Sequence, residues 1–144
     1  MEKQENQNPI FQQGERAPAE YFTGTAWVKM LVPNDTTFNC QIGNVVFEAG
    51  ARNNWHTHPG GQILIVTEGT GYYQEKGKPV QIVHKGDVLK CTPGVAHWPG
   101  AAPDSAFGYI AVSPTQKGET KWLQRVTDQE YQSADSKQNK NDKQ

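Results

Sequence analysis

Short apolar runs, interrupted roughly every 8 to 12 residues by Gly, Pro and Asn, restrict this 144-residue chain to a narrow range of folds. The runs are rich in β-branched and aromatic residues and are too closely interrupted for ordinary helices. The expected strands are residues 26–32, 38–47, 63–67, 71–74, 80–84, 88–91 and 107–112, with 122–126 as a further candidate. The pattern predicts an all-β domain whose antiparallel strands form a closed barrel or a sandwich.

Two of the expected strands carry irregular apolar patterns. The apolar positions change phase between Ile42 and Val45, which predicts a β-bulge at Gly43 and Asn44. Residues 63–66 are apolar at every position, which is typical of a strand covered on both sides. We therefore expect both faces of this strand to be buried.

Both ends of the chain are polar. Residues 1–14 consist mainly of Gln, Asn and Glu, and residues 133–144 contain one Ala among Ser, Asn, Asp, Gln and Lys. Such segments bury too little apolar surface to offset the entropy lost on ordering, so we expect disordered tails around a single domain at 15–132. Thr127 and Glu130 match a capping box, so a brief helix is expected from residue 128 to residue 132.

The charge balance excludes several kinds of partner. Fourteen Lys and Arg against fifteen Asp and Glu give a net charge of -1, which provides no basic field to gather nucleic acid. No apolar run reaches the ~18–20 residues that span a bilayer. We therefore expect neither a nucleic acid nor a membrane as a partner, and we attribute the hydrophobic content of only 35% to the polar tails.

The N-terminus and the cysteines bear on the compartment. The first residues show neither the apolar stretch of a secretory signal nor the Arg-rich pattern of a transit peptide. Cys40 and Cys91 are too few for a disulfide framework, and their strand-like surroundings favour buried thiols. We therefore expect a soluble cytoplasmic protein.

Three of the four histidines fall where an all-β fold can bring them together. His56 and His58 are two residues apart, so they lie on one face of an extended strand. Gln62 begins the next strand on an apolar face, and His97 comes from a later one. Three imidazole nitrogens and an amide oxygen suit Mn, Fe, Co, Ni or Zn. The spacing predicts a divalent metal site, whereas His84 is expected at the surface.

The spacing of these residues resembles the two motifs of the cupin superfamily. The first motif is matched at its expected intervals, with one substitution, by Gly50, His56, His58, Gln62 and Gly69. The second motif is matched by Gly86, Asp87, Pro93, Gly94 and His97. The resemblance implies a double-stranded β-helix, that is, a jelly-roll barrel with a metal held inside it.

The chain departs from the cupin pattern at three positions. Gln62 replaces the usual Glu, Pro93 lies one position late, and Ala101 stands where Asn often follows the last histidine. A shell of three His and one Gln is neutral, so it leaves the full charge of a divalent metal uncancelled. Such a site favours an anionic ligand and acts as a stronger Lewis acid toward an oxygen of the substrate.

A wider stretch, about residues 16–132, resembles one subgroup of cupins. The matching residues are 21–24, 50–59, 61–62, 93–94, 97–98, 122 and 126–128. The subgroup consists of small bacterial cupins related to manganese-dependent hydroxynitrile lyases and to the cupin partners of carboxymuconolactone decarboxylase-like proteins. The resemblance implies manganese as the first choice of metal, bound to His56, His58, Gln62 and His97, and cleavage of a cyanohydrin to an aldehyde and cyanide.

The same resemblance implies an acid/base histidine on a later strand, where this chain has Tyr109. A phenol with a pKa near ~10 donates a proton but is a poor base at neutral pH. Arg52 is a candidate partner for a substrate carboxylate. Tyr109 and Arg52 are therefore the candidate catalytic residues, with core packing and an exposed loop position as the respective alternatives.

We expect a metal-dependent lyase or isomerase that acts on a small oxygenated substrate, with an anionic substrate favoured by the neutral ligand shell. Two alternatives are an Fe(II)-dependent dioxygenase and a non-catalytic cupin that binds a small molecule such as a sugar acid. The apolar segment 21–32 precedes the motifs, so we expect it to pair across a homodimer or a higher homo-oligomer.

Overall fold

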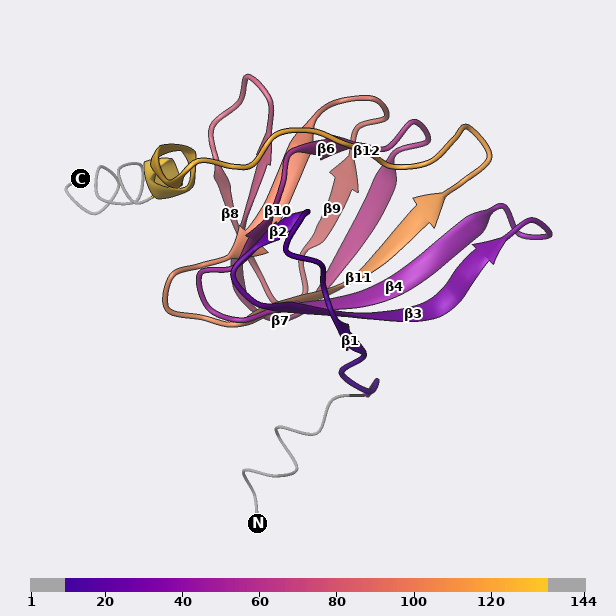
Figure 1. Ribbon diagram of the computed structural model, residues 1–144, viewed down its shortest axis with the longest axis horizontal. Coiled ribbons are helices and arrows are strands. Elements are labelled where there is room, and N and C mark those ends of the chain that lie inside the picture. The colour runs from indigo at the N-terminus through magenta and orange to yellow at the C-terminus, as the bar shows by residue number, and fades with distance from the viewer. Residues whose placement is uncertain (1–9, 135–144) are drawn as a thin grey trace, which may run out of the picture.

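Strands that curl around a common interior make up most of the computed structural model, which describes residues 10–134 (Figure 1). In chain order these strands are β1 Glu15–Arg16, β2 Phe22–Thr23, β3 Ala26–Asp35, β4 Cys40–Phe47, β5 Arg52–Asn53, β6 His56–Thr57, β7 Gln62–Glu75, β8 Gln81–His84, β9 Val88–Cys91, β10 His97–Ala101, β11 Phe107–Pro114 and β12 Lys121–Trp122. All of their pairings are antiparallel. The predicted all-β jelly-roll architecture is confirmed.

The long strand β7 joins two sheets. Its first half pairs with β11 and β9, and its second half pairs with β10 and β8. Between these halves Gly69 adopts a φ of +76°, and a Cβ at this position would lie only 1.7 Å from the Ala106 carbonyl oxygen. Only glycine fits at this position. The two strands predicted at 63–67 and 71–74 are therefore parts of one continuous strand, which passes through Gly69.

The C-terminal segment covers the outside of the second sheet. Residues 128–134 are helical, and the predicted capping box is formed, because Thr127 Oγ1 accepts from Glu130 N at 3.0 Å and Glu130 Oε1 accepts from Thr127 N at 2.9 Å. An apolar layer beneath the helix includes Trp55, Trp98, Tyr72, Tyr131 and Val126. The helix continues to the fully buried Ala134, two residues beyond the predicted end of the helix at residue 132.

The predicted bulge at Gly43 and Asn44 is wrong. Strand β4 pairs with β11 through eight consecutive residues without a register shift, whereas the shift opposite Gly43 lies in β3, between Met30 and Val32. The apolar phase changes because β4 has apolar residues on both faces: Val45 lines the interior, whereas Ile42 is on the other face.

The prediction that residues 63–66 are covered on both faces is also wrong for the single chain. Leu64 and Val66 are buried, but Ile63 and Ile65 are 41% and 39% exposed on the outer face of the sheet. Both cysteines are free, Cys91 being buried and Cys40 half-buried.

Three expectations about partners and termini remain predictions. Within residues 10–134 no helix is long and apolar enough to cross a membrane. The homodimer stays a prediction; in the single chain, Tyr21, Phe22 and Val28 line a cavity. Most of the two segments predicted to be disordered tails lies outside the described residues.

Candidate metal centre

Three imidazoles from two neighbouring strands and the loop after β6 meet inside the barrel. His56 in β6 pairs directly with His97 in β10, and His58 follows two residues after His56. The ring centroids are 4.5 Å apart for His56 and His97, 4.9 Å for His56 and His58, and 5.4 Å for His58 and His97. One nitrogen from each residue lies within 4.8 Å of the others, so the predicted cluster could hold a metal ion.

Hydrogen bonds at the Nδ1 atoms leave the three Nε2 atoms available. His56 Nδ1 lies 2.8 Å from the Asn54 carbonyl oxygen and His97 Nδ1 lies 3.3 Å from that of Val95. A carbonyl only accepts, so these Nδ1 atoms carry the proton and each Nε2 keeps its lone pair. His58 Nδ1 pairs with Thr120 Oγ1 at 3.1 Å, and the Nε2 atoms of His58 and His97 are buried without a hydrogen-bond partner.

Burial keeps the cluster uncharged. It lowers the pKa of His58 to about 4, with the neighbouring His97 contributing, and it lowers the pKa of His56 well below its usual range. The pKa of His97 is lowered chiefly by burial. Neutral imidazole is the form that binds a metal, so the three groups are ready to ligate at neutral pH.

Gln62 lies beside the cluster in a fixed orientation. It starts β7, lines the same cavity as His56 and His58, and donates from its Nε2 to Ser113 Oγ in β11 at 2.9 Å. An amide that donates through its nitrogen leaves its oxygen free to accept or to ligate.

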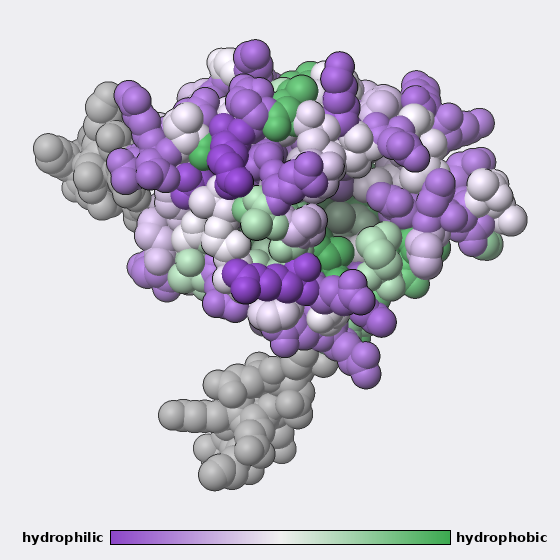
Figure 2. Space-filling view, viewed as in Figure 1, coloured by the Kyte–Doolittle hydropathy of each residue, from purple (hydrophilic) through white to green (hydrophobic). Residues whose placement is uncertain are grey.

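A cavity of about 210 Å³ opens onto His56 and His58, while His97 lies deeper and is fully buried. Its walls are largely apolar and aromatic, with Pro18, Tyr21, Phe22, Val28, Met30, Val45 and Trp122 among the lining residues. Figure 2 shows apolar side chains gathered near the middle of this face, in the area between the β3–β4 pair and β12 in Figure 1. None of the described residues that line the cavity is Lys, Arg, Asp or Glu.

Tyr109 and Asn53 are polar groups in this cavity. Tyr109 is 3% exposed, and the Asn53 side chain is close enough to interact with its hydroxyl. Burial raises the pKa of Tyr109 far above its usual range, so the phenol keeps its proton. Asn53 is also buried, and its Oδ1 has no hydrogen-bond partner. The pair therefore leaves one unmatched polar atom at the cavity wall.

The structure does not bring Arg52 to the cavity. Its Nη2 donates to Asp128 Oδ1 at 2.7 Å and to the Val126 carbonyl oxygen at 3.1 Å. The guanidinium lies 4.5 Å from the centre of the Tyr131 ring. These contacts fix the C-terminal helix against the second sheet, so Arg52 is buried in packing and is neither in an exposed loop nor at the candidate site.

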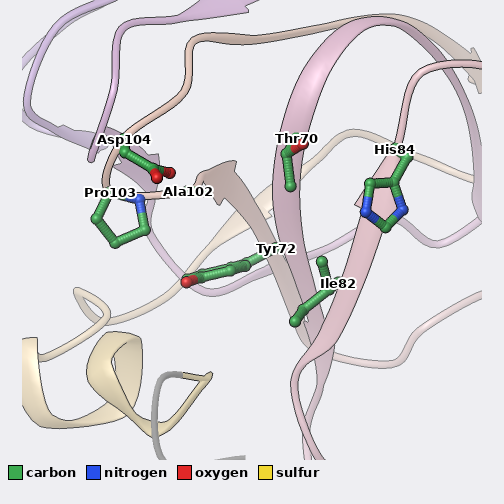
Figure 3. Close-up of a pocket in the computed structure, with 7 residues that line it drawn as sticks. All are labelled: Thr70, Tyr72, Ile82, His84, Ala102, Pro103 and Asp104. Atoms are coloured by element: carbon green, nitrogen blue, oxygen red, sulfur yellow. The ribbon is translucent and has the colours of Figure 1, made fainter. Parts of the chain in front are cut away.

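A larger cavity, of about 540 Å³, lies elsewhere on the molecule (Figure 3). His84 and Asp104 face it from opposite sides, with Thr70 and Tyr72 between them. His84 is exposed, as predicted, and the cavity has no cluster of metal-ligating groups among the described residues. The three-histidine cluster therefore makes the smaller cavity the candidate site.

The residues that orient the cluster were missed by the sequence analysis. Ser113 and Thr120 lie 51 and 62 residues from the side chains they contact, and Asn53 meets Tyr109 only through the strand arrangement. Asn53 pairs directly with Phe22 between β5 and β2, and that register is visible only in the folded structure.

Comparisons with known proteins agree with the motif pattern. The cupin domain family matches residues 43–113. The chain is 42% identical over 117 residues to (R)-mandelonitrile lyase of Granulicella tundricola, covering 81% of this chain and 89% of the lyase. It is 51% identical to a cupin-like protein of Thermotoga maritima, with a TM-score of 0.86 over 88% of this chain and 97% of that one.

A more distant structure shares the fold alone. A predicted oxalate decarboxylase of Thermotoga maritima is 18% identical, with a TM-score of 0.62 over 76% of this chain and 91% of that chain. The fold, the family match and the similarity to the lyase agree with one another. The chain therefore belongs to the cupin family.

Proposed function

We propose that the cluster binds one divalent transition metal through the Nε2 atoms of His56, His58 and His97, with manganese as the first choice and Fe, Ni, Zn or Co as alternatives. The observation that carries the proposal is that one nitrogen from each of the three histidines lies within 4.8 Å of the others. Each Nδ1 already has a hydrogen-bond partner, which favours the Nε2 atoms as the ligands. When bound, a metal supplies Lewis-acid polarisation of a substrate oxygen.

We assign the fourth position to the Oε1 atom of Gln62. The hydrogen bond from Gln62 Nε2 to Ser113 supports this assignment, because it fixes which end of the amide is turned away from Ser113. The ligand shell would then carry no charge, so the site would retain the full positive charge of the metal.

The proposed substrate is neutral and has an apolar or aromatic body beside an oxygenated carbon. Aromatic and aliphatic walls suit such a body, and the absence of basic lining residues within the described chain gives no support to the expected anionic substrate. Tyr109 would donate a hydrogen bond to the substrate, and Asn53 Oδ1 would accept a hydrogen bond from the hydroxyl of the substrate. Arg52 has no place in this proposal.

The proposed reaction is cleavage of a 2-hydroxynitrile. The bond between the hydroxyl-bearing carbon and the nitrile carbon breaks, the carbonyl of the aldehyde forms, and the hydroxyl proton leaves while cyanide takes up a proton. The 42% identity to a mandelonitrile lyase supports this reaction class, and the cavity volume of about 210 Å³ suits a small substrate.

The test is release of benzaldehyde from mandelonitrile by protein that has been stripped and reloaded with Mn, Fe, Ni or Zn. We expect metal-dependent turnover that is the same with and without oxygen. Turnover that requires Fe(II) and oxygen would support the dioxygenase instead. Metal binding without any turnover would support a binding protein.

A further inference from the structure

We propose that Glu75, a carboxylate outside the cavity, is a positioning residue that supplies the negative charge missing from the Gln62-containing ligand set. The inference rests on the proposed metal site. It concerns the side of the cluster away from the cavity, where His97 lies against β7.

The strand register places Glu75 beside His97. The two residues are directly paired between the antiparallel strands β7 and β10, so their side chains project from the same face. Tyr73, two residues earlier on the same face of β7, has its ring centroid 5.5 Å from that of His97. Neither Glu75 nor Tyr73 lines the cavity that opens onto His56 and His58.

The carboxylate of Glu75 is buried and surrounded by donors. Its Oε2 accepts from the Tyr73 hydroxyl at 3.0 Å, from Thr92 N at 3.2 Å and from Thr92 Oγ1 at 3.1 Å. Its Oε1 accepts from Lys78 Nζ at 3.2 Å. Burial alone would raise the pKa of Glu75, but these hydrogen bonds outweigh it and hold the pKa below its usual range, so the group is ionised.

The negative charge of Glu75 is only partly balanced by positive charge within the protein. Lys78 is the one cation paired with Glu75 among the described residues, and its side chain is 71% exposed, so solvent screens it. A buried anion beside a ligating imidazole favours a dication more strongly than it favours a single proton. Glu75 thus raises metal affinity through His97 without entering the space that a substrate would occupy.

The test compares Mn(II) dissociation constants of the wild type, Glu75→Gln and Lys78→Gln, measured by titration of the stripped full chain. Glu75→Gln keeps the size of the side chain and an acceptor for Tyr73, so we expect affinity to weaken about 10-fold. Lys78→Gln removes the opposing cation, so we expect unchanged or up to about 2-fold tighter binding. The Co(II) absorption bands should keep their shape in both variants, because the ligands are unchanged.

A purely structural role predicts a different pattern. It predicts that both substitutions weaken binding and lower the Tm of the metal-free chain together. If Glu75→Gln and the wild type bind Mn(II) equally well, the inference is overturned. It is also overturned if Lys78→Gln weakens Mn(II) binding. The Lys78→Gln result can be used even if Glu75→Gln does not fold. If the wild type itself binds no Mn(II), the proposed metal site fails and the inference fails with it.

Discussion

The two sides of the histidine cluster differ in chemistry. On the cavity side, His56 and His58 meet largely apolar walls, and the other polar lining residues are Gln41, Asn53, Gln62, Tyr109, Ser113 and Thr120. On the far side, His97 lies next to a buried carboxylate that is saturated with hydrogen bonds. Under the proposed function, the far side would set the affinity for metal and the cavity side would select and orient the substrate.

Loss of one histidine of the cluster is expected to have the largest effect on metal binding. We expect His56→Ala to weaken metal binding at least about 100-fold and to abolish metal-dependent turnover, because one of three buried nitrogens is lost. His84→Ala is the matched control, since His84 is exposed and lies outside the cluster. Metal analysis and turnover of the two variants in parallel check this; equal losses in both would refute the assignment.

Acid should destabilise the metal-free chain through the same imidazoles. His58 has a folded-state pKa of about 4, against about 6.5 when unfolded, so between these values the unfolded chain binds a proton that the folded chain does not. The free energy of unfolding therefore falls as the pH drops from 6.5 to 4, on the order of 3 kcal/mol from His58 alone. Urea unfolding across this range measures it, and a His58→Gln variant should show a flatter dependence.

Tyr109 separates substrate handling from metal binding. Tyr109→Phe removes the hydroxyl and keeps the ring packed against Phe47 and Phe107. We expect kcat to fall about 10- to 100-fold with Mn(II) affinity unchanged, because Tyr109 lines the cavity but is not one of the proposed metal ligands. Steady-state kinetics and metal titration check the two parts; unchanged kcat would make Tyr109 a packing residue.

Ser113 gives the smallest expected effect. Ser113→Ala removes the acceptor that orients Gln62, at a cost of about one neutral hydrogen bond, so metal affinity should weaken about 5-fold. Ser105→Ala is a control, because Ser105 bonds only backbone atoms at a distant turn. Affinity that is equal in the two variants would show that the hydrogen bond to Ser113 does not hold Gln62 in a ligating orientation.

Short sequence motifs predicted the residues that gather at the candidate site. His56, His58 and Gln62 follow from strand alternation, and His97 from the second motif. Arg52 was misplaced because its sequence neighbours do not reveal that β5 turns this side chain toward the C-terminal helix. Ser113, Thr120 and Glu75 depend on strand register between distant segments, which a single sequence does not encode locally.

The proposed function depends on one metal ion held by three buried imidazoles. The most direct measurement is metal content per chain after reloading with Mn(II), combined with pulsed EPR detection of nitrogen coupled to the bound manganese. We expect one ion per wild-type chain, coupled to imidazole nitrogen, and loss of that ion in His97→Ala. A full equivalent of metal retained by His97→Ala, or bound manganese without nitrogen coupling, would contradict it.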